Sequence, residues 1–263
     1  VIKSYKARGK EKLMLKFIFI SPHYDDAVGS CACLIDWLIR KKYSVDILTV
    51  FSRQYIGKKS ELAQNILDFC GLEDGVVERT LENKKACSYL HVNDVDLLFY
   101  DAIYRKNAQG RWIYNSFVDL FGNVNEEDNI LLQMLFQEIQ NKYMTYETFL
   151  FFPSAKGGHV DHKVINQVGF LLKNAGYNVC FYDEFSYNEK YCYLSALNQK
   201  KILFSFEELN IKINAVKFYK SQHRMLFPNK SVEEYYINMN QLNNKWFELY
   251  YTFPGEKNLI DIF

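Results

Sequence analysis

The stretch from residue 17 to residue 29 reads Phe17-Ile18-Phe19-Ile20-Ser21-Pro22-His23-Tyr24-Asp25-Asp26-Ala27-Val28-Gly29 and decides the fold of this 263-residue chain. Its first four residues are apolar and rich in aromatic and β-branched side chains, which predicts a buried strand of a parallel sheet. Apolar residues then recur at helical spacing, at Leu34, Ile35, Leu38 and Ile39. A histidine and two adjacent carboxylates therefore lie where a strand ends and a helix begins, the position at which open α/β sheets bind ligands.

The side chains of this turn suit a metal ion. His23 offers a neutral imidazole and Asp26 a carboxylate, and both groups are common zinc ligands. A strand that turns into a helix aims positions 23 and 26 at one point, which leaves Asp25 free to act on a proton. The alternative is that Asp25 or Asp26 only caps the helix, since aspartate is a favoured N-cap residue. The histidine beside both carboxylates favours a site, because a carboxylate that is buried without a partner loses solvation free energy.

A second polar turn repeats this arrangement. Gly157-Gly158-His159-Val160-Asp161-His162 follows the strand-like run 148–153, and a helical apolar pattern begins directly after it. His159 and His162 are three residues apart and share one face at the start of that helix. His162 would add a third ligand to His23 and Asp26 and leave one position for water, as catalytic zinc requires. The alternative is a pair of capping or core histidines.

The two motifs together resemble those of the PIG-L/LmbE-like metal-dependent N-deacetylases, which remove acetyl groups from N-acetylglucosamine units. The first motif of that family is roughly (Ala/Ser)-Pro-His-x-Asp-Asp and matches residues 21–26, and the second is His-x-Asp-His and matches residues 159–162. Ala27 continues the first motif as in the Asp-Asp-Ala branch, which is associated with saccharide and natural-product pathways, antibiotic biosynthesis included. This chain has Ala27 where many relatives have Glu, and Ala32-Cys33 where they have a Gly-Gly pair. The likeness extends to about Phe227.

The resemblance also implies the chemistry of the site. Zinc is the usual metal of the family, here one Zn2+ per chain, with Fe2+ as the alternative. Asp25 would be the general base that takes the proton of the attacking water, and His159 would help to hold the oxyanion. Asp161, hydrogen-bonded to His159, would set the tautomer of that imidazole and raise its basicity.

Two further residues match sugar-contacting positions of the family. Arg79, in the stretch Arg79-Thr80-Leu81-Glu82, would contact the sugar, and Asp101 would hold a sugar hydroxyl. The residues alone favour other roles, a surface salt bridge for Arg79 and a helix cap for Asp101. In the long connection 104–124, Trp112 and Tyr114 are candidates for stacking on a sugar ring, but the abundance of Phe and Tyr in this chain favours ordinary packing for any one aromatic.

A pair of acids follows the strand-like run 178–182. Asp183-Glu184 resembles the Tyr-Glu-Asp run of the saccharide-associated branch, with the two acids in reversed order. Two roles are open for these carboxylates. They either support the metal ligands from behind, or they meet amino groups of the substrate.

The composition fits a globular enzyme and excludes other classes. The chain has 32 Lys and Arg residues against 31 Asp and Glu, a net charge of +1, whereas a nucleic-acid binder is usually markedly basic. No apolar run reaches the roughly 18 residues of a membrane helix, and no long apolar stretch follows the basic start as in a signal peptide. The six cysteines are scattered in apolar segments, which favours reduced thiols. We therefore expect a cytoplasmic protein without nucleic-acid partners or membrane insertion.

The order of the elements predicts one α/β domain over residues 1–263. Strands at about 16–21 and 44–51 enclose a helix at about 27–41, and this βαβ unit is typical of doubly wound sheets. The predicted fold class is a Rossmann-like three-layer sandwich with a mostly parallel sheet. Residues 1–15 are expected to form a polar lead-in, and residues from about 228 to 263 a C-terminal extension packed on the domain.

Three of the remaining predicted elements bear on the site. A strand is expected at 96–100, directly before Asp101. Helices are expected at 60–72, with Phe69 on the inner face, and at 206–224.

The chemistry of the two turns and the family resemblance lead to one predicted function. We expect a zinc-dependent N-deacetylase, a hydrolase that removes the N-acetyl group from an N-acetylglucosamine-type amino sugar and releases acetate and a free amine. One alternative is a metallophosphoesterase, which needs more bridging ligands than two turns provide. The other is a non-catalytic binding domain on the same scaffold. The pattern specifies neither the acceptor sugar nor an oligomeric state.

Overall fold

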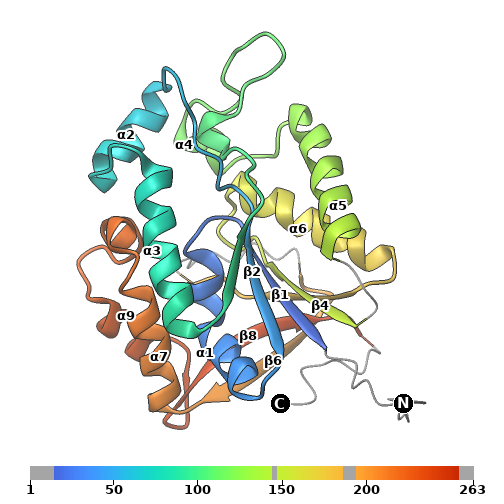
Figure 1. Cartoon of the computed structure of the whole chain (residues 1–263), viewed down its shortest axis with the longest axis vertical. Coiled ribbons are helices and arrows are strands. Elements are labelled where there is room, and N and C mark those ends of the chain that lie inside the picture. The colour runs from blue at the N-terminus through green and yellow to red at the C-terminus, as the bar shows by residue number, and fades with distance from the viewer. Residues whose placement is uncertain (1–14, 144–146, 186–193, 255–263) are drawn as a thin grey trace.

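The computed structural model describes residues 15–143, 147–185 and 194–254. Their core is an eight-stranded sheet with the strand order β3-β2-β1-β4-β5-β8-β6, in which β7 also pairs with β8 (Figure 1). The parallel strands are β1 (Lys16–Ser21), β2 (Ser44–Thr49), β3 (Asn93–Asp96), β4 (Thr148–Pro153) and β5 (Asn178–Tyr182). The antiparallel pairs involve β6 (Asn198–Phe204), β7 (Gln241–Leu242) and β8 (Lys245–Thr252). The predicted α/β fold with a mostly parallel sheet is confirmed.

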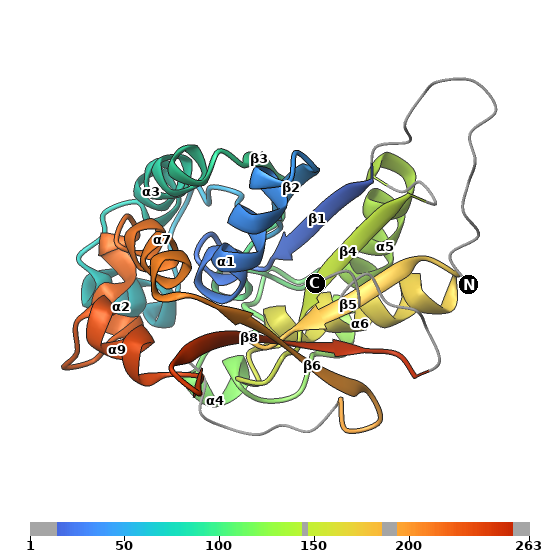
Figure 2. The same cartoon turned by 90° about the horizontal axis from the view of Figure 1, so that it is seen from below.

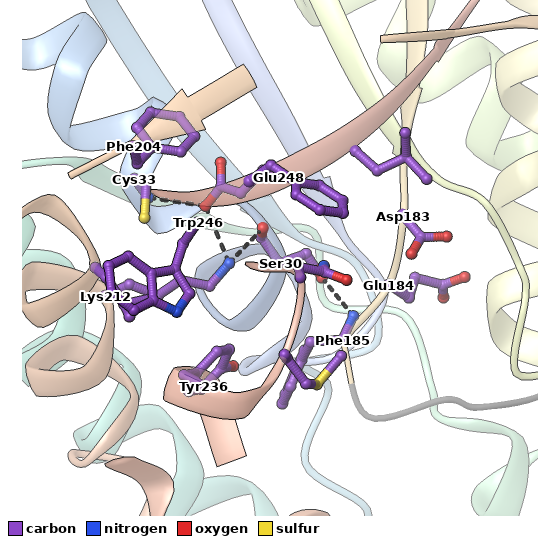
Figure 3. Close-up of a pocket in the computed structure, with 15 residues that line it drawn as sticks. Ser30, Cys33, Asp183, Glu184, Phe185, Phe204, Lys212, Tyr236, Trp246 and Glu248 are labelled. Carbon is purple, nitrogen blue, oxygen red and sulfur yellow. Dashed lines mark hydrogen bonds and ion pairs between the residues drawn. The ribbon is translucent and has the colours of Figure 1, made fainter. Parts of the chain in front are cut away.

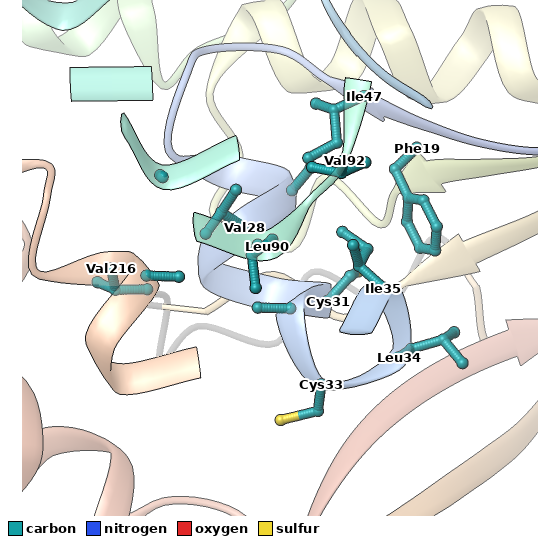
Figure 4. Close-up of a cluster of buried hydrophobic side chains, with 14 of the residues drawn as sticks. Phe19, Val28, Cys31, Cys33, Leu34, Ile35, Ile47, Leu90, Val92 and Val216 are labelled. Carbon is teal, nitrogen blue, oxygen red and sulfur yellow. The ribbon is translucent and has the colours of Figure 1, made fainter. Parts of the chain in front are cut away.

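Helices cover both faces of the sheet, so the fold has three layers (Figures 1 and 2). One face carries α1 (Asp26–Arg40), α3 (Gly75–Leu90) and α7 (Phe206–Val216), and the other carries α5 (Asn129–Tyr143) and α6 (Val160–Asn174). In β1, Phe17 and Phe19 belong to the first of these cores, and Ile18 and Ile20 to the second. Because both faces are covered, the four central positions of this strand, residues 17–20, are all apolar instead of alternately apolar and polar. Figure 4 shows part of the first core, where side chains of α1, α3 and α7 meet those of β1 and β2.

Shorter elements connect these layers. They are α2 (Glu61–Cys70), η1 (Ala102–Tyr104), α4 (Phe117–Leu120), η2 (Glu126–Asp128), η3 (Lys220–Gln222), α8 (His223–Leu226) and α9 (Val232–Asn238). Helix starts follow capping residues: Ser60 Oγ accepts the N–H of Ala63 at 3.0 Å before α2, and Ser205 forms a capping box with Glu208 before α7.

The strand predicted at 96–100 is wrong. β3 ends at Asp96, and Leu98 has a φ of +59°, a left-handed conformation that turns the backbone out of the extended line. The amide of Leu97 still donates to the carbonyl oxygen of Thr49, the last residue of β2, at 2.8 Å, and the amide of Phe99 to that of Val50 at 3.1 Å. The irregular segment therefore runs along β2 and carries Asp101 to the carboxyl edge of the sheet.

Two predicted helices end earlier than expected. α2 stops at Cys70 because Gly71 takes a left-handed φ of +68°, and Phe69 is 44% exposed, so its predicted inward position is wrong. The helix predicted at 206–224 ends at Val216. Beyond Val216 the chain is no longer α-helical, and Tyr219 is fully buried, with its hydroxyl hydrogen-bonded to Asn83 Oδ1 at 2.8 Å.

The C-terminal region forms part of the sheet instead of packing on it from outside. β8 lies between β5 and β6, and its Tyr250 pairs with Tyr182 on one side and with Lys200 on the other. α9 precedes β8 and packs against α7. Of the predicted lead-in, residues 1–14 lie outside the described residues, as do residues 255–263 of the predicted extension.

A carboxylate from β8 enters the backbone hydrogen bonding of α1 (Figure 3). Glu248 accepts the N–H groups of Cys33 and Leu34, at 3.0 and 3.1 Å. In a regular α-helix these two amides would donate to the carbonyl groups four residues earlier. Lys212 of α7 donates to the carbonyl oxygen of Ser30 at 2.7 Å and to Glu248 at 3.0 Å. This buried network attaches the C-terminal strand to the helix whose first turn carries the predicted metal ligand Asp26.

Candidate metal centre

The two predicted metal turns meet at the centre of the sheet. After β1 the chain runs outward through β2 and β3, and it then returns to β4 on the other side of β1. β1 and β4 are therefore neighbouring parallel strands between which the strand order reverses, and the carboxyl ends of such strands form the crevice where open α/β sheets bind ligands. His23 follows β1, Asp26 is the first residue of α1, and His162 lies in the first turn of α6.

The first turn is held by its own side chains. Asp26 Oδ2 accepts the backbone N–H of His23 at 2.8 Å, and Ser21 Oγ accepts the N–H of Ala27 at 3.0 Å. Asp25 occupies the N-cap position of α1, but its side chain makes no capping hydrogen bond. The alternative in which Asp25 or Asp26 only caps this helix is therefore wrong, because Ser21 supplies the cap.

The three predicted ligands come together in one triangle. His23 Nδ1, His162 Nε2 and Asp26 Oδ2 are each 3.3 Å from the other two. Zinc–ligand bonds of about 2.0–2.1 Å at tetrahedral angles place ligand atoms about 3.3–3.4 Å apart. Two imidazole nitrogens and one carboxylate oxygen at this spacing fit three corners of a tetrahedral zinc site, with the fourth corner left for water or substrate.

The second nitrogen of each histidine faces a carboxylate. His23 Nε2 lies 3.1 Å from Asp161 Oδ2, and His162 Nδ1 contacts Glu184 Oε1. A carboxylate behind a histidine fixes its tautomer and orients the opposite nitrogen toward a metal. Of the two roles open for the acids after β5, Glu184 thus takes the supporting one. Its neighbour Asp183 instead pairs with Lys156 at 3.1 Å.

The charges around the triangle favour a cation. Burial alone would lower the pKa of His162, but Asp26 and Glu184 outweigh burial and raise that pKa. Burial also opposes ionisation of Asp26, yet His162 and His23 hold the pKa of its carboxyl far below the usual range. The same field that favours protons on the imidazoles attracts a divalent cation to the triangle.

The predicted partner of Asp161 is wrong. Its carboxylate does not bond to His159; it contacts His23, the guanidinium of Arg105 at 2.5 Å and the N–H of Ala102 at 3.1 Å. It is the backbone N–H of Asp161 that donates to His159 Nδ1, at 3.2 Å. Sequence reasoning missed Arg105, which is buried, because no local pattern separates an arginine paired in the core from one on the surface.

His159 is a neutral hydrogen-bond donor. Burial lowers the pKa of His159 to about 3, so the imidazole is uncharged at neutral pH. Since Nδ1 accepts from the backbone N–H of Asp161, the ring proton lies on Nε2. The ring stands edge-on to His23 and to Phe121, with centroid separations of 5.3 and 5.4 Å.

Arg79 forms a salt bridge inside the site and not on the surface. Its Nη2 donates to Asp25 Oδ1 at 2.8 Å, and the Asp25 side chain is only 7% exposed. Asp101 has the capping role that the residues alone favour, at a short 3-10 helix, and also contacts His23. Its Oδ1 caps η1 by accepting the N–H of Ile103 at 3.1 Å, while its Oδ2 lies 3.4 Å from His23 Nε2.

One cavity of about 150 Å³ joins these groups. The polar side chains that line it are those of His23, Tyr24, Asp25, Asp26, Cys70, Arg79, Asp101, Tyr104, His159 and Gln222. Of the expected stacking candidates, Tyr114 is buried and bonded to Asp128, and neither it nor Trp112 lines the cavity. The connection contributes Phe117 and Phe121 instead.

A second group of donors in the described residues does not make a second independent site. His23, His159 and Asp161 also lie within coordinating distance of one another. This group shares His23 with the triangle, and Asp161 is already held by Arg105. The described residues therefore offer ligands for one ion, whereas a two-metal phosphoesterase requires two ions held together.

The comparison with protein families decides the membership of the chain. The model of the PIG-L family, described as GlcNAc-PI de-N-acetylase, matches residues 18–172, a span that includes both metal turns. The chain belongs to the PIG-L family. A 2'-N-acetylparomamine deacetylase of Niallia circulans is 33% identical over 186 residues, which cover 65% of this chain and 67% of that protein.

Solved structures similar to this PIG-L protein include two other deacetylases. The zinc-inhibited form of the teicoplanin deacetylase Orf2 aligns with a TM-score of 0.78 at 22% identity and covers 90% of this chain and 97% of its own. The A40926 pseudoaglycone deacetylase Dbv21 aligns with a TM-score of 0.72 at 22% identity and covers 90% and 96%. These likenesses extend the shared fold over most of the chain, well beyond residue 172.

Among the described residues, no helix is both long enough and apolar enough to span a membrane.

Proposed function

We propose that this PIG-L protein is a metal-dependent N-deacetylase that hydrolyses the acetamido group of an N-acetylglucosamine-type amino sugar, in a pathway of natural-product or antibiotic biosynthesis. Acetate and a free amine are the products. The observation that carries the proposal is the triangle of His23, Asp26 and His162 at the inner end of a cavity, with Asp25 and the neutral His159 beside it. Family membership and the deacetylase relative support the same reaction.

The metal of the proposal is zinc, one ion per chain, held by His23 Nδ1, Asp26 Oδ2 and His162 Nε2. When bound, zinc supplies Lewis acidity toward the amide carbonyl and lowers the pKa of water. Two histidines and one carboxylate are also the ligands of many iron(II) sites, so Fe2+ is the competing assignment. Metal analysis of protein purified without added metal, followed by activity after loading with each ion, separates the two.

Each residue beside the triangle has a role in the proposed reaction. Asp25 accepts the proton of the attacking water, and its salt bridge to Arg79 orients the carboxylate. His159 donates its Nε2–H in a hydrogen bond to the oxyanion that forms from the acetyl carbonyl. Because the imidazole is neutral, it can serve as this donor without carrying a buried positive charge. The leaving amine takes the proton that Asp25 received from the attacking water, because the neutral His159 has only its Nε2 proton and keeps it in the hydrogen bond to the oxyanion. Asp161 orients His23 from behind and fixes the tautomer of His159 through its backbone amide.

Arg79 and Asp101 are proposed to meet the sugar. Both line the cavity next to the triangle, and a guanidinium and a carboxylate offer the donor and the acceptor that a pair of sugar hydroxyls requires. Since Arg79 also holds Asp25, its replacement is expected to lower kcat on every substrate. Replacement of Asp101 by Asn is expected to damage hydrolysis of an N-acetylglucosaminide more than hydrolysis of a minimal acetamide.

The proposed setting is a single domain in the cytoplasm. The five cysteines in the described residues are free thiols, three of them buried, and such thiols persist in a reducing compartment. The balanced net charge of +1 fits a small-molecule substrate and not a nucleic acid.

The decisive experiment compares the two adjacent aspartates by acetate release from methyl N-acetylglucosaminide and by metal content. Asp25→Asn should keep the metal and lose about 10²–10⁴-fold in rate, as expected for a lost general base. Asp26→Asn should lose metal affinity, and excess zinc should restore part of the activity. Asp36→Asn, on the same helix in an exposed pair with Arg40, is the control and should change neither quantity. If both variants at positions 25 and 26 keep full activity, the proposed mechanism is wrong.

A further inference from the structure

The cavity of the metal centre continues outward between apolar walls. Six side chains from three separate segments form what we call the outer wall: Ile66 and Leu67 of α2, Phe117 with Phe121 at the end of α4, and Met225 with Leu226 of α8. None of these residues belongs to the two metal motifs. The α2 and α4 residues of the outer wall are about 50 positions apart in sequence, and the α4 and α8 residues about 100. The outer wall is therefore a feature of the tertiary structure.

Exposure increases from the metal triangle to the outer wall. His162 is 1% exposed and Asp26 6%. In the outer wall Phe121 and Met225 are each 41% exposed and Phe117 is 57% exposed, and only Leu67 is buried, at 3%. The reacting amide must therefore lie at the deep, polar end, and the part of the substrate farthest from it must lie at the apolar mouth. Contiguous exposed apolar side chains around a cavity mark a surface that is covered when a ligand binds.

The charged groups of the cavity are all at the inner end. Among the described lining residues the carboxylates are Asp25, Asp26 and Asp101, and the only strong cation is Arg79. Asp25 is paired with Arg79, Asp26 belongs to the metal triangle, and Asp101 faces His23. The outer wall offers no carboxylate that could pair with an ammonium group. A cationic group held there would lose hydration without gaining a partner, which is costly.

We propose that the outer wall binds an apolar aglycone, an alkyl or aryl group attached to the amino sugar on the side away from the acetamide. This inference rests on the proposed deacetylase function and narrows its substrate class. The same wall disfavours an acceptor whose aglycone carries several ammonium groups. The proposal assigns the outer wall to the aglycone and not to a long N-acyl chain, because the acyl carbon must react at the buried metal triangle.

The test uses the metal-loaded full chain and four soluble substrates: the methyl, hexyl and 6-aminohexyl glycosides of N-acetylglucosamine, and methyl N-hexanoylglucosaminide. Each buried methylene favours binding by about fourfold, since it contributes roughly 0.8 kcal/mol. Burial of two or three methylenes should therefore raise kcat/KM of the hexyl glycoside roughly 10–100-fold over the methyl glycoside. The 6-aminohexyl glycoside should lose most of that gain, because its ammonium group has no partner in the wall.

Two outcomes overturn the inference while acetate release still supports the deacetylase. The first is a hexyl glycoside that is no better than the methyl or the 6-aminohexyl glycoside. The second is a preference for the N-hexanoyl substrate, which would place the apolar chain on the acyl side. If no substrate is hydrolysed, the proposed function fails. Calorimetric binding of hexyl and methyl glucosaminides then decides the inference alone, since equal affinities refute the apolar subsite and tighter hexyl binding supports it.

Variants locate the effect in the outer wall. Met225→Asn and Phe117→Asn alter half-exposed side chains, so folding should be preserved, and each should reduce the hexyl-to-methyl ratio of kcat/KM about three- to tenfold. Ile130→Asn is the matched control, because Ile130 is 69% exposed on α5 and does not line the cavity. An unchanged ratio in both wall variants, or an equal fall in the control, contradicts the assignment.

Discussion

Replacing Lys212 with methionine will lower the free energy of unfolding by about 3 kcal/mol. The Lys212 ammonium is buried, and it bonds to the carbonyl oxygen of Ser30 at 2.7 Å and to Glu248 at 3.0 Å (Figure 3). Methionine preserves most of the side-chain volume but removes the charge. The Glu248 carboxylate then remains buried without its cation.

The magnitude follows from the contacts that Glu248 keeps. Removing one partner of a buried ion pair typically costs about 3–5 kcal/mol, because an uncompensated charge stays in the interior. Glu248 still accepts from the amides of Cys33 and Leu34 and from the Tyr250 hydroxyl, at 2.8–3.1 Å. Three remaining donors stabilise the carboxylate, which places the expected loss at the lower end of this range.

Urea unfolding followed by circular dichroism measures the loss. With an m-value of about 3 kcal/mol/M, the midpoint should fall by about 1 M. Lys217→Met is the matched control, because the pair between Lys217 and Glu233 is about 40% exposed on both sides and is expected to contribute less than about 1 kcal/mol.

A double variant tests the physical cause. Adding Glu248→Gln to Lys212→Met removes the stranded charge, so the double variant should be more stable than Lys212→Met alone. The explanation is refuted if Lys212→Met costs no more than the Lys217→Met control. It is also refuted if the effects of the two substitutions simply add.

Three further predictions concern the site and its support. Glu184→Gln should weaken zinc affinity about 10–100-fold in a chelator competition, since it loosens the contact behind the ligand His162, whereas Asp183→Asn should leave that affinity nearly unchanged. Gly29→Ala should cost about 1–3 kcal/mol in urea unfolding, because the added methyl overlaps the buried ring of Phe185; a loss below about 0.5 kcal/mol would show that the ring moves freely. Removing the metal with a chelator should lower the melting temperature by roughly 5–10 °C, relative to protein in zinc at about 100 times its Kd. Added zinc should reverse the change. Equal melting temperatures would contradict a metal bound to the folded state.

Local sequence determined the elements that hold the site. The apolar run before His23 is a strand because aromatic and β-branched residues at every position need cover on both faces, and the structure supplies that cover. The polar turn after it and the turn around His159 and His162 have the predicted strand–turn–helix form. Residue type and spacing within some twenty positions are sufficient for such features, because they depend on backbone propensity and on periodic burial.

The tertiary structure alone decided which side chains meet. Nothing near Asp161 in the sequence indicates that its carboxylate bonds to His23 and Arg105 instead of His159, and nothing near β8 indicates that Glu248 enters the hydrogen bonding of α1. The C-terminal strand was missed for the same reason, since its place in the sheet depends on β5 and β6. The apolar outer wall likewise arises only where α2, α4 and α8 converge. Contacts between segments this far apart are set by how whole layers pack, and the order of residues within any one segment does not contain that information.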